Sequence, residues 1–241
     1  MDEISSSRPL PSVWKTFEKI INQKLRKFWV QDLPRDQIED ALDFMQAYFI
    51  RDEPMNKALN ILEDEASMEC FRVIWKRLFM QGYSLACYTK LENGENKLVA
   101  VNCCIRKLSG DPDDRERYVK GVCMKKVYEL MKYVKSLRDP LEIGIREYLA
   151  GMGLATIPEF RGHNIGLEIL HARKSLCIAR GIEASITAFT SPASQRLAEK
   201  AGFKDFISIT FDEIAEKNPS LKIPNINDYS KRVRHMYILY E

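Results

Sequence analysis

Short apolar strands and amphipathic helices alternate through the last third of the chain. The expected strands are rich in β-branched and aromatic residues and lie at 152–157, 182–189, 203–211 and 235–240. Between them, residues 162–180 and 192–201 are expected to be helices, the first with apolar residues at helical spacing. The order strand, helix, strand, helix, strand predicts an α/β fold with a mixed sheet flanked by helices.

The first two thirds of the chain add elements of the same kinds. Two strands, 83–90 and 97–106, are separated by the turn-like residues 92–96 and should form a hairpin. Another strand is expected at 27–33. The remaining helices are expected over 36–53, 55–81, 127–134 and 143–149.

The N-terminal segment has a helical pattern of its own. Its apolar residues predict a short amphipathic helix and are Val13, Trp14, Phe17, Ile20 and Ile21. We expect residues 1–24 to form an extension with this helix and residues 25–241 to form a single domain. A chain of 241 residues, 45% of them hydrophobic, is large enough for one substantial core.

Charge and cysteine usage exclude several classes of protein. The 37 basic residues nearly balance the 34 acidic ones, which argues against nucleic acid or membrane binding. No apolar run approaches the length of a membrane span, and the first twelve residues lack the apolar core of a signal peptide. The six cysteines show no C-x-x-C spacing and the three histidines no ligand spacing, so no metal site is expected. We therefore expect a cytoplasmic protein, and a monomer.

The segment 155–166 is where a strand turns into a helix through a loop of arginine and small residues. Successive backbone N–H groups at such a turn converge on an anion, and the helix dipole and the Arg161 guanidinium favour it further. His163 is a second side chain that could touch a phosphate. The loop is therefore interpreted as a pyrophosphate cradle, although an ordinary strand-to-helix connection has the same pattern.

From about Gly151 to Phe203 the chain resembles the acetyl-CoA-binding core of the GNAT superfamily of N-acetyltransferases. The loop pattern of that superfamily is Arg or Gln, two residues, Gly, one residue, then Gly or Ala; Arg161 and Gly166 match it, and Asn164 replaces the middle glycine. The resemblance implies a mostly antiparallel sheet with a splayed central strand pair that forms the acetyl-CoA cleft. It also implies a set of cofactor-binding residues, namely Leu154, Ala155, Thr156, Arg161, Gly162, His163, Asn164, Ile165 and Gly166.

Asn164 can replace glycine for either of two reasons. The glycine of the pattern can serve positive φ, which asparagine tolerates better than other non-glycine residues. It can instead serve close approach of the backbone to the phosphate, which no side chain helps. We expect the first reason to apply and Asn164 to lie in the left-handed region.

A narrower resemblance covers most of the chain. Residues 49–56, Phe-Ile-Arg-Asp-Glu-Pro-Met-Asn, are similar to the F-x-x-x-D-E-P-L-N segment of insect arylalkylamine N-acetyltransferases, as is the helix that contains Ser194. In that family the glutamate is the general base and two serines four residues apart assist. The matching positions here are Glu53, Thr190 and Ser194.

The resemblance implies direct transfer of acetyl from acetyl-CoA to an arylalkylamine or related small amine. An alkylammonium with a pKa of about 10.4 must lose a proton before it attacks a thioester. Glu53 is expected at the C-terminal end of a helix, where the dipole raises the proton affinity of a carboxylate. A strand N–H near Ala155 would stabilise the oxyanion, and Ser194 would donate to the leaving thiolate.

Other interpretations of these residues stay open. Asp52 and Glu53 can be two solvated acids, and Ser194 a polar residue in a helical turn already capped by Ser191. The acceptor can be another amine class, such as a polyamine or a hydrazine. The chain can also be a non-catalytic CoA-binding module on the same fold.

Overall fold

The computed structural model describes residues 11–111 and 113–240. Its centre is an eight-stranded sheet in the order β1-β2-β3-β4-β5-β6-β8-β7. The strands are β1 (Val13–Ile21), β2 (Lys24–Asp32), β3 (Leu85–Lys90), β4 (Asn96–Leu108), β5 (Glu147–Thr156), β6 (Ala184–Phe189), β7 (Lys204–Thr210) and β8 (Arg232–Leu239). Neighbouring strands are antiparallel except β5 and β6, which are parallel, so the predicted mixed, mostly antiparallel sheet is confirmed.

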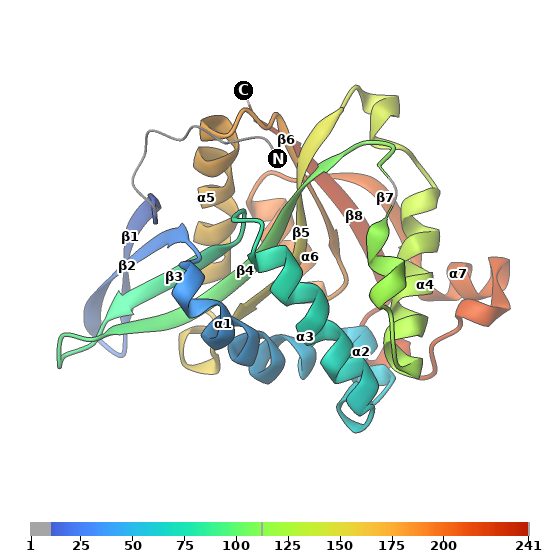
Figure 1. Ribbon diagram of the computed structural model, residues 1–241, viewed down its shortest axis with the longest axis horizontal. Coiled ribbons are helices and arrows are strands. Elements are labelled where there is room, and N and C mark those ends of the chain that lie inside the picture. Colours follow the sequence, from blue (N-terminus) through green and yellow to red (C-terminus); the bar gives the residue numbers. More distant parts are fainter. Residues whose placement is uncertain (1–10, 112, 241) are drawn as a thin grey trace.

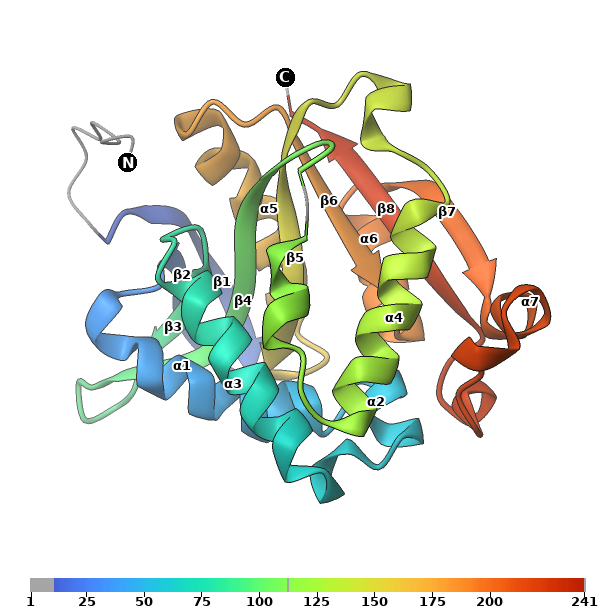
Figure 2. The same ribbon diagram turned by 45° about the vertical axis from the view of Figure 1, so that its right-hand side comes forward.

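Helices cover both faces of this sheet (Figure 1). The α-helices are α1 (Ile38–Met45), α2 (Pro54–Ala58), α3 (Glu65–Phe79), α4 (Val122–Ser136), α5 (Ile165–Ala179), α6 (Pro192–Lys200) and α7 (Phe211–Lys217). Helices α1 to α4 lie on one face, whereas α5 and α6 lie behind the sheet on the other (Figure 2). One five-residue π-helical turn, Gln46–Ile50, continues α1 towards α2.

Two large apolar clusters stabilise the layers. The larger one joins strands β1 to β5 to α1, α3 and α5, and includes Phe28, Leu42, Trp75 and Leu176. The second lies between α4 and the β7–β8 end of the sheet, around Leu130, Phe206 and Val233. The sheet therefore has two packed halves, and they meet near the β5–β6 contact.

Four elements differ from the sequence prediction. The helix predicted at 55–81 is divided into α2 and α3 by the segment 59–64. The predicted helix around residues 13–21 is wrong, because this segment is the edge strand β1 of the same sheet. Phe17 of β1 stacks on Phe28 of β2, and Lys19 forms an ion pair with Glu168 of α5. The helix predicted at 143–149 is also wrong, since β5 begins at Glu147, and α7 was not predicted.

All six cysteines are unpaired, five of them buried. No helix within the described ranges is both long and apolar enough to cross a membrane.

Candidate active site

Strands β5 and β6 form a fork. They pair only at Leu149 with Ser185, Ala150 with Ile186 and Gly151 with Thr187. Beyond Gly151, β5 stays with β4 up to Thr156, while β6 stays with β8 up to Phe189. Because the two strands are parallel, their C-terminal ends diverge on the same side, and the predicted splayed pair is present.

The backbone of β5 offers hydrogen-bonding groups to this fork. The N–H of Ile157 donates to Val99 O of β4 (3.0 Å), and Ala155 lies opposite Val101. Since N–H groups alternate in direction along a strand, Ala155 faces β4, while Leu154 and Thr156 face the fork. The backbone groups that face the fork are therefore those of its two neighbours, and cofactor binding by Leu154, Ala155 and Thr156 stays a prediction.

The loop after β5 holds a row of backbone N–H groups. Gly162 and Asn164 have φ of 82° and 59°, so the left-handed conformation predicted for Asn164 is confirmed. Asn164 is the N-cap of α5, and its side chain makes no capping hydrogen bond. Among the described residues, the N–H groups of 162–166 have no hydrogen-bond acceptor. They are the orphan donors of a helix start, which is the arrangement that binds anions.

Two other loop residues have packing roles. Ile165 is buried in the core, so only its backbone can face a ligand. A Cβ on Gly166 would lie 2.9 Å from Leu197 Cδ2, so glycine here lets α5 pack closely on α6. His163 is half-buried and belongs to the same turn.

Arg161 links the loop to the segment before α2. Its Nε donates to Thr156 O (2.8 Å), and its Nη1 lies 2.8 Å from Asp52 Oδ2. Partial burial raises the pKa of Asp52, but hydrogen bonds from Arg51 and Arg161 outweigh it and leave the pKa below its ordinary value. The side chain of Arg161 remains substantially exposed, at 42%.

Glu53 is a buried carboxylate, only 8% exposed. It is the N-cap of α2: its Oε2 accepts from Asn56 N–H (2.8 Å), and Pro54 fills the first helical position. Its Oε1 accepts from the Thr190 hydroxyl (2.8 Å). Burial raises the pKa of Glu53, and these hydrogen bonds oppose the rise. The expected helix C-terminal dipole is therefore not the cause, because the carboxylate caps a helix N-terminus.

Ser194 lies one turn further along. It forms a capping box with Ser191: Ser191 Oγ accepts from Ser194 N–H (3.1 Å), and Ser194 Oγ accepts from Ser191 N–H (3.2 Å). The Ser194 hydroxyl also donates to Ser191 O (2.9 Å). The structure thus brings Glu53 and Thr190 into contact, and holds Ser194 in the first turn of α6.

The Asp52-Glu53 pair spans the open end of the fork. Asp52 contacts Arg161, which follows β5, and Glu53 contacts Thr190, which follows β6. Next to them, Asn56 is 1% exposed, and its side-chain amide has no hydrogen-bond partner within the described part of the chain. The predicted base and the predicted hydroxyl are therefore in contact, and the ion pair between Asp52 and Arg161 connects them to the loop.

Some residues around the fork were missed by sequence reasoning. On one side, Trp75 Nε1 donates to Met152 O (3.1 Å), and the Phe49 ring packs edge-on against Trp75. On the other side, Arg173 of α5 is 1% exposed and bonds to β4 and β6. An arginine next to the apolar stripe of a predicted core helix was the available signal.

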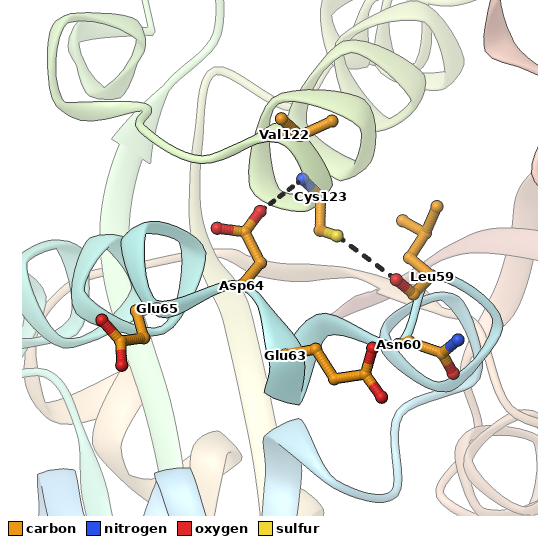
Figure 3. A pocket seen from close by; sticks show the side chains of 7 residues that line it. All are labelled: Leu59, Asn60, Glu63, Asp64, Glu65, Val122 and Cys123. Carbon is orange, nitrogen blue, oxygen red and sulfur yellow. Dashed lines mark hydrogen bonds between the residues drawn. The ribbon is translucent and has the colours of Figure 1, made fainter.

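A cavity of about 650 Å³ lies elsewhere, between the starts of α3 and α4 (Figure 3). Asp64, one of the three acidic residues that line it, caps α3 and accepts from Cys123 N–H (3.0 Å). No predicted site residue lines this cavity. The described residues contain no group of three or more His, Cys, Asp or Glu that could hold a metal ion.

The structure is similar to solved structures of acetyltransferases. It superposes on a crystal structure provisionally named insect arylalkylamine N-acetyltransferase 7, from the yellow fever mosquito Aedes aegypti, with a TM-score of 0.86 and 32% identity over 98% of both chains. It also matches arylalkylamine N-acetyltransferase 2 of Aedes aegypti (TM-score 0.73, 15% identity, 89% of this chain and 99% of that chain). A third match is the Drosophila melanogaster polyamine N-acetyltransferase (TM-score 0.71, 16% identity, 88% and 99%).

The last two similarities show the fold alone, because identity is low. No family model matches the sequence, and a search of curated proteins finds no match. The similarity at 32% identity extends over nearly the whole of both chains, includes the fork and the loop, and agrees with the resemblance carried by residues 49–56. The chain therefore belongs to the insect arylalkylamine N-acetyltransferases, acyltransferases with the GNAT fold.

Proposed function

We propose that the protein transfers acetyl from acetyl-CoA directly to an arylalkylamine or a related small amine. The observation that carries this proposal is the buried Glu53 carboxylate, held against Thr190 at the open end of the β5–β6 fork. A buried carboxylate with a raised pKa, at the open end of the fork, is suited to general-base catalysis.

The chain offers two places to acetyl-CoA. The N–H groups of 162–166, which have no acceptor among the described residues, suit the pyrophosphate together with Arg161. The fork-facing backbone of Leu154 and Thr156 suits the pantetheine arm, which would lie alongside β5 as an added strand. These features support a co-substrate that enters at the loop and points its thioester into the fork.

Glu53 would take the proton that the attacking ammonium must lose. The amine nitrogen then bonds to the thioester carbon, the C–S bond breaks, and the electron pair leaves on sulfur. The N–H of Leu154 faces the fork, which supports it as the donor that would stabilise the oxygen that becomes negative. Ser194 would donate a proton to the leaving thiolate after its hydroxyl rotates away from Ser191 O, and the second proton that the nitrogen loses as the amide forms would restore this hydroxyl. Per acetyl transferred, an ammonium becomes an amide, CoA leaves as a thiol, and one proton is released.

The rings around β5 favour an aromatic acceptor. The edge of the Phe49 ring lies 3.4 Å from the position of a Cβ on Gly153, and Trp75 packs against Phe49. The half-buried Phe49 ring, with the buried Trp75 behind it, would offer an apolar surface to an aryl group. A relative of the same fold acts on polyamines and forms N-acetylagmatine, so polyamines and hydrazines are the alternative acceptors to test.

An amine panel tests the proposal. The purified protein would receive acetyl-CoA with tryptamine, phenethylamine, spermidine, agmatine or hydrazine, and thiol release would be recorded. We expect thiol release to be fastest with the two arylalkylamines. Faster release with spermidine, agmatine or hydrazine would reassign the acceptor, and CoA binding without release from any amine would show a non-catalytic module.

We further propose that the protein works as a cytoplasmic monomer without a metal. Its six unpaired thiols suit a reducing compartment.

A further inference from the structure

Arg173 is a buried charge with neutral partners. It lies on α5, 1% exposed, beneath the point where β5 and β6 part. Its guanidinium donates to Asn102 Oδ1 (2.9 Å), Thr187 Oγ1 (2.8 Å) and Ser185 Oγ (3.1 Å). Among the described residues, no carboxylate forms an ion pair with it. A buried charge without a counter-ion is costly, so its retention points to a role.

Each residue that accepts a hydrogen bond from Arg173 also forms a hydrogen bond with the backbone of β5. The Ser185 hydroxyl donates to Leu149 O (2.9 Å), and Thr187 Oγ1 accepts from Gly151 N–H (3.2 Å). Asn102 Nδ2 donates to Gly153 O (2.8 Å). The three contacts are made to alternate residues of β5, namely Leu149, Gly151 and Gly153. Gly151 is the last residue of β5 that pairs with β6, and Gly153 lies beyond it.

The hydrogen bond that Asn102 donates is accepted by the peptide group between Gly153 and Leu154. The carbonyl of Gly153 and the N–H of Leu154 belong to the same planar trans peptide, so they point in opposite directions. The carbonyl faces Asn102 on β4, and the N–H therefore faces the fork. Hydrogen bonds in a chain polarise one another, so a cation that pulls on Asn102 makes Leu154 N–H a stronger donor.

We propose that Arg173 is a positioning residue which acts through Asn102 to orient and polarise the N–H of Leu154, the oxyanion donor. The inference rests on the proposed function, because it assigns a role within that reaction. The positive charge lies behind the sheet, away from both substrates. It strengthens the donor without a contact of its own with the acetyl group.

Gly151 supports the close approach of Arg173. A Cβ at this position would lie 2.6 Å from Arg173 Nη2 and 2.4 Å from Thr187 Oγ1. The guanidinium thus lies directly against the backbone of β5, and any side chain there would displace it.

Two variants test the proposal, Asn102→Asp and Arg173→Met. An aspartate at 102 keeps the shape and the contact with Arg173, but it cannot donate to Gly153 O when ionised. Arg173→Met removes the charge and keeps most of the side-chain volume. Thr89→Val is the matched control, because it removes a buried hydroxyl that donates to Lys27 O on β2, and Thr89 lies on β3, which β4 separates from β5.

We expect kcat to fall about tenfold or more in both variants, since removal of a whole oxyanion donor costs about 10²–10³. The KM for the amine and the Kd for CoA, which has no thioester carbonyl, should change less than about threefold. The carbonyl stretch of bound ¹³C-acetyl-CoA should move to higher frequency in both variants and stay unchanged in Thr89→Val.

An unchanged carbonyl stretch in folded Asn102→Asp would overturn the proposal, as would a loss of CoA affinity equal to the loss of kcat. Should Arg173→Met fail to fold, Asn102→Asp decides alone. Failure of the proposed function would look different, since the wild-type protein itself would then release no thiol with any amine.

Discussion

Glu53 and Arg173 are both buried charged residues, but their surroundings differ in kind. Glu53 is bound by one backbone N–H and one hydroxyl, and burial raises its pKa, so a proton can come and go. Arg173 is fixed by three neutral acceptors, Asn102, Ser185 and Thr187. The surroundings of Glu53 suit proton transfer, whereas those of Arg173 suit a fixed positive charge that polarises its neighbours.

Glu53→Gln should lower turnover and leave CoA affinity nearly unchanged. The amide keeps the shape but cannot accept the proton of the ammonium, so we expect kcat to fall about 10²-fold or more at neutral pH. A higher pH should restore part of the rate, because more of the amine is then neutral. Unchanged turnover at neutral pH would contradict the assignment of Glu53 as the base.

The same substitution should stabilise the fold in a pH-dependent way. The raised pKa means that the folded state holds this proton above the ordinary value of 4.5, so the carboxylate destabilises the fold as pH rises past that value. Glu53→Gln removes this effect. Its melting temperature should match the wild type at pH 4 and exceed it increasingly towards pH 7; a constant difference would show that ionisation of Glu53 is not the cause.

Asn164 allows a test of the loop conformation. Its φ of 59° is in the left-handed region, which asparagine and glycine tolerate and β-branched residues do not. We expect Asn164→Gly to bind CoA within about threefold of wild type, and Asn164→Val to lose about 1–3 kcal/mol of stability through strain. Calorimetric titration and thermal melts measure both. Tighter binding by the glycine variant would show that the side chain hinders phosphate.

Arg161→Glu should weaken CoA binding by at least about tenfold, because it places a negative charge against the pyrophosphate and loses a charge-assisted hydrogen bond. Lys174→Glu makes the same charge change at an exposed position further along α5 and serves as the control. Equal affinities for all three proteins would remove the phosphate site from this loop.

At the residue scale, the sequence predicted the backbone conformation of a residue better than the contacts that surround a buried charge. The left-handed Asn164 followed from side-chain preference alone, which is a local property. The environment of Glu53 did not, because burial against Thr190 depends on a contact across 137 positions of sequence. Arg173 was missed for the same reason, since its partners come from β4 and β6.

At the element scale, the spacing of apolar residues predicted a helix or strand correctly where the element was long and had one buried face. Helix α5 and strands β3, β4 and β6 fit their patterns. Strand β1 did not, because its apolar residues Val13, Trp14, Phe17, Ile20 and Ile21 also fit helical spacing, and an edge strand buries few of them. The start of β5 lacks alternation because both of its faces are covered.

Gly151, where β5 and β6 separate, is expected to be sensitive to substitution. Gly151→Ala would press a methyl group against Thr187 and Arg173, and such overpacking costs about 1–3 kcal/mol. We expect a lower melting temperature and, because the methyl group displaces Arg173, a lower kcat. Gly166→Ala is the comparison, because its methyl group meets mainly the end of the half-buried Leu197 side chain, which can move, and alanine favours a helix. A larger loss in Gly166→Ala than in Gly151→Ala would contradict this account.

At the scale of the whole molecule, the sheet is divided where the ligand should bind. Only three residue pairs join β5 to β6, and the larger apolar cluster lies mainly on the β1–β5 side, whereas the second lies on the β7–β8 side. A ligand that contacts both arms of the fork would therefore connect the two halves. Binding to the folded state alone adds about 2.7 kcal/mol of stability at a ligand concentration of 100 Kd.

Hydrogen exchange can locate that connection. The N–H groups of Leu154 and Thr156 face the fork and should exchange quickly without ligand, whereas Ala155 N–H, paired with β4, should be protected throughout. Saturating CoA should slow exchange at Leu154 and Thr156, because the pantetheine arm supplies acceptors along β5, and also at 162–166, where the pyrophosphate accepts. Adenosine 3′,5′-diphosphate lacks the pantetheine arm, so it should protect none of the fork residues. Protection of the loop by CoA with no change at Leu154 would mean that the arm lies outside the fork, and the oxyanion donor would then have to be sought on another strand.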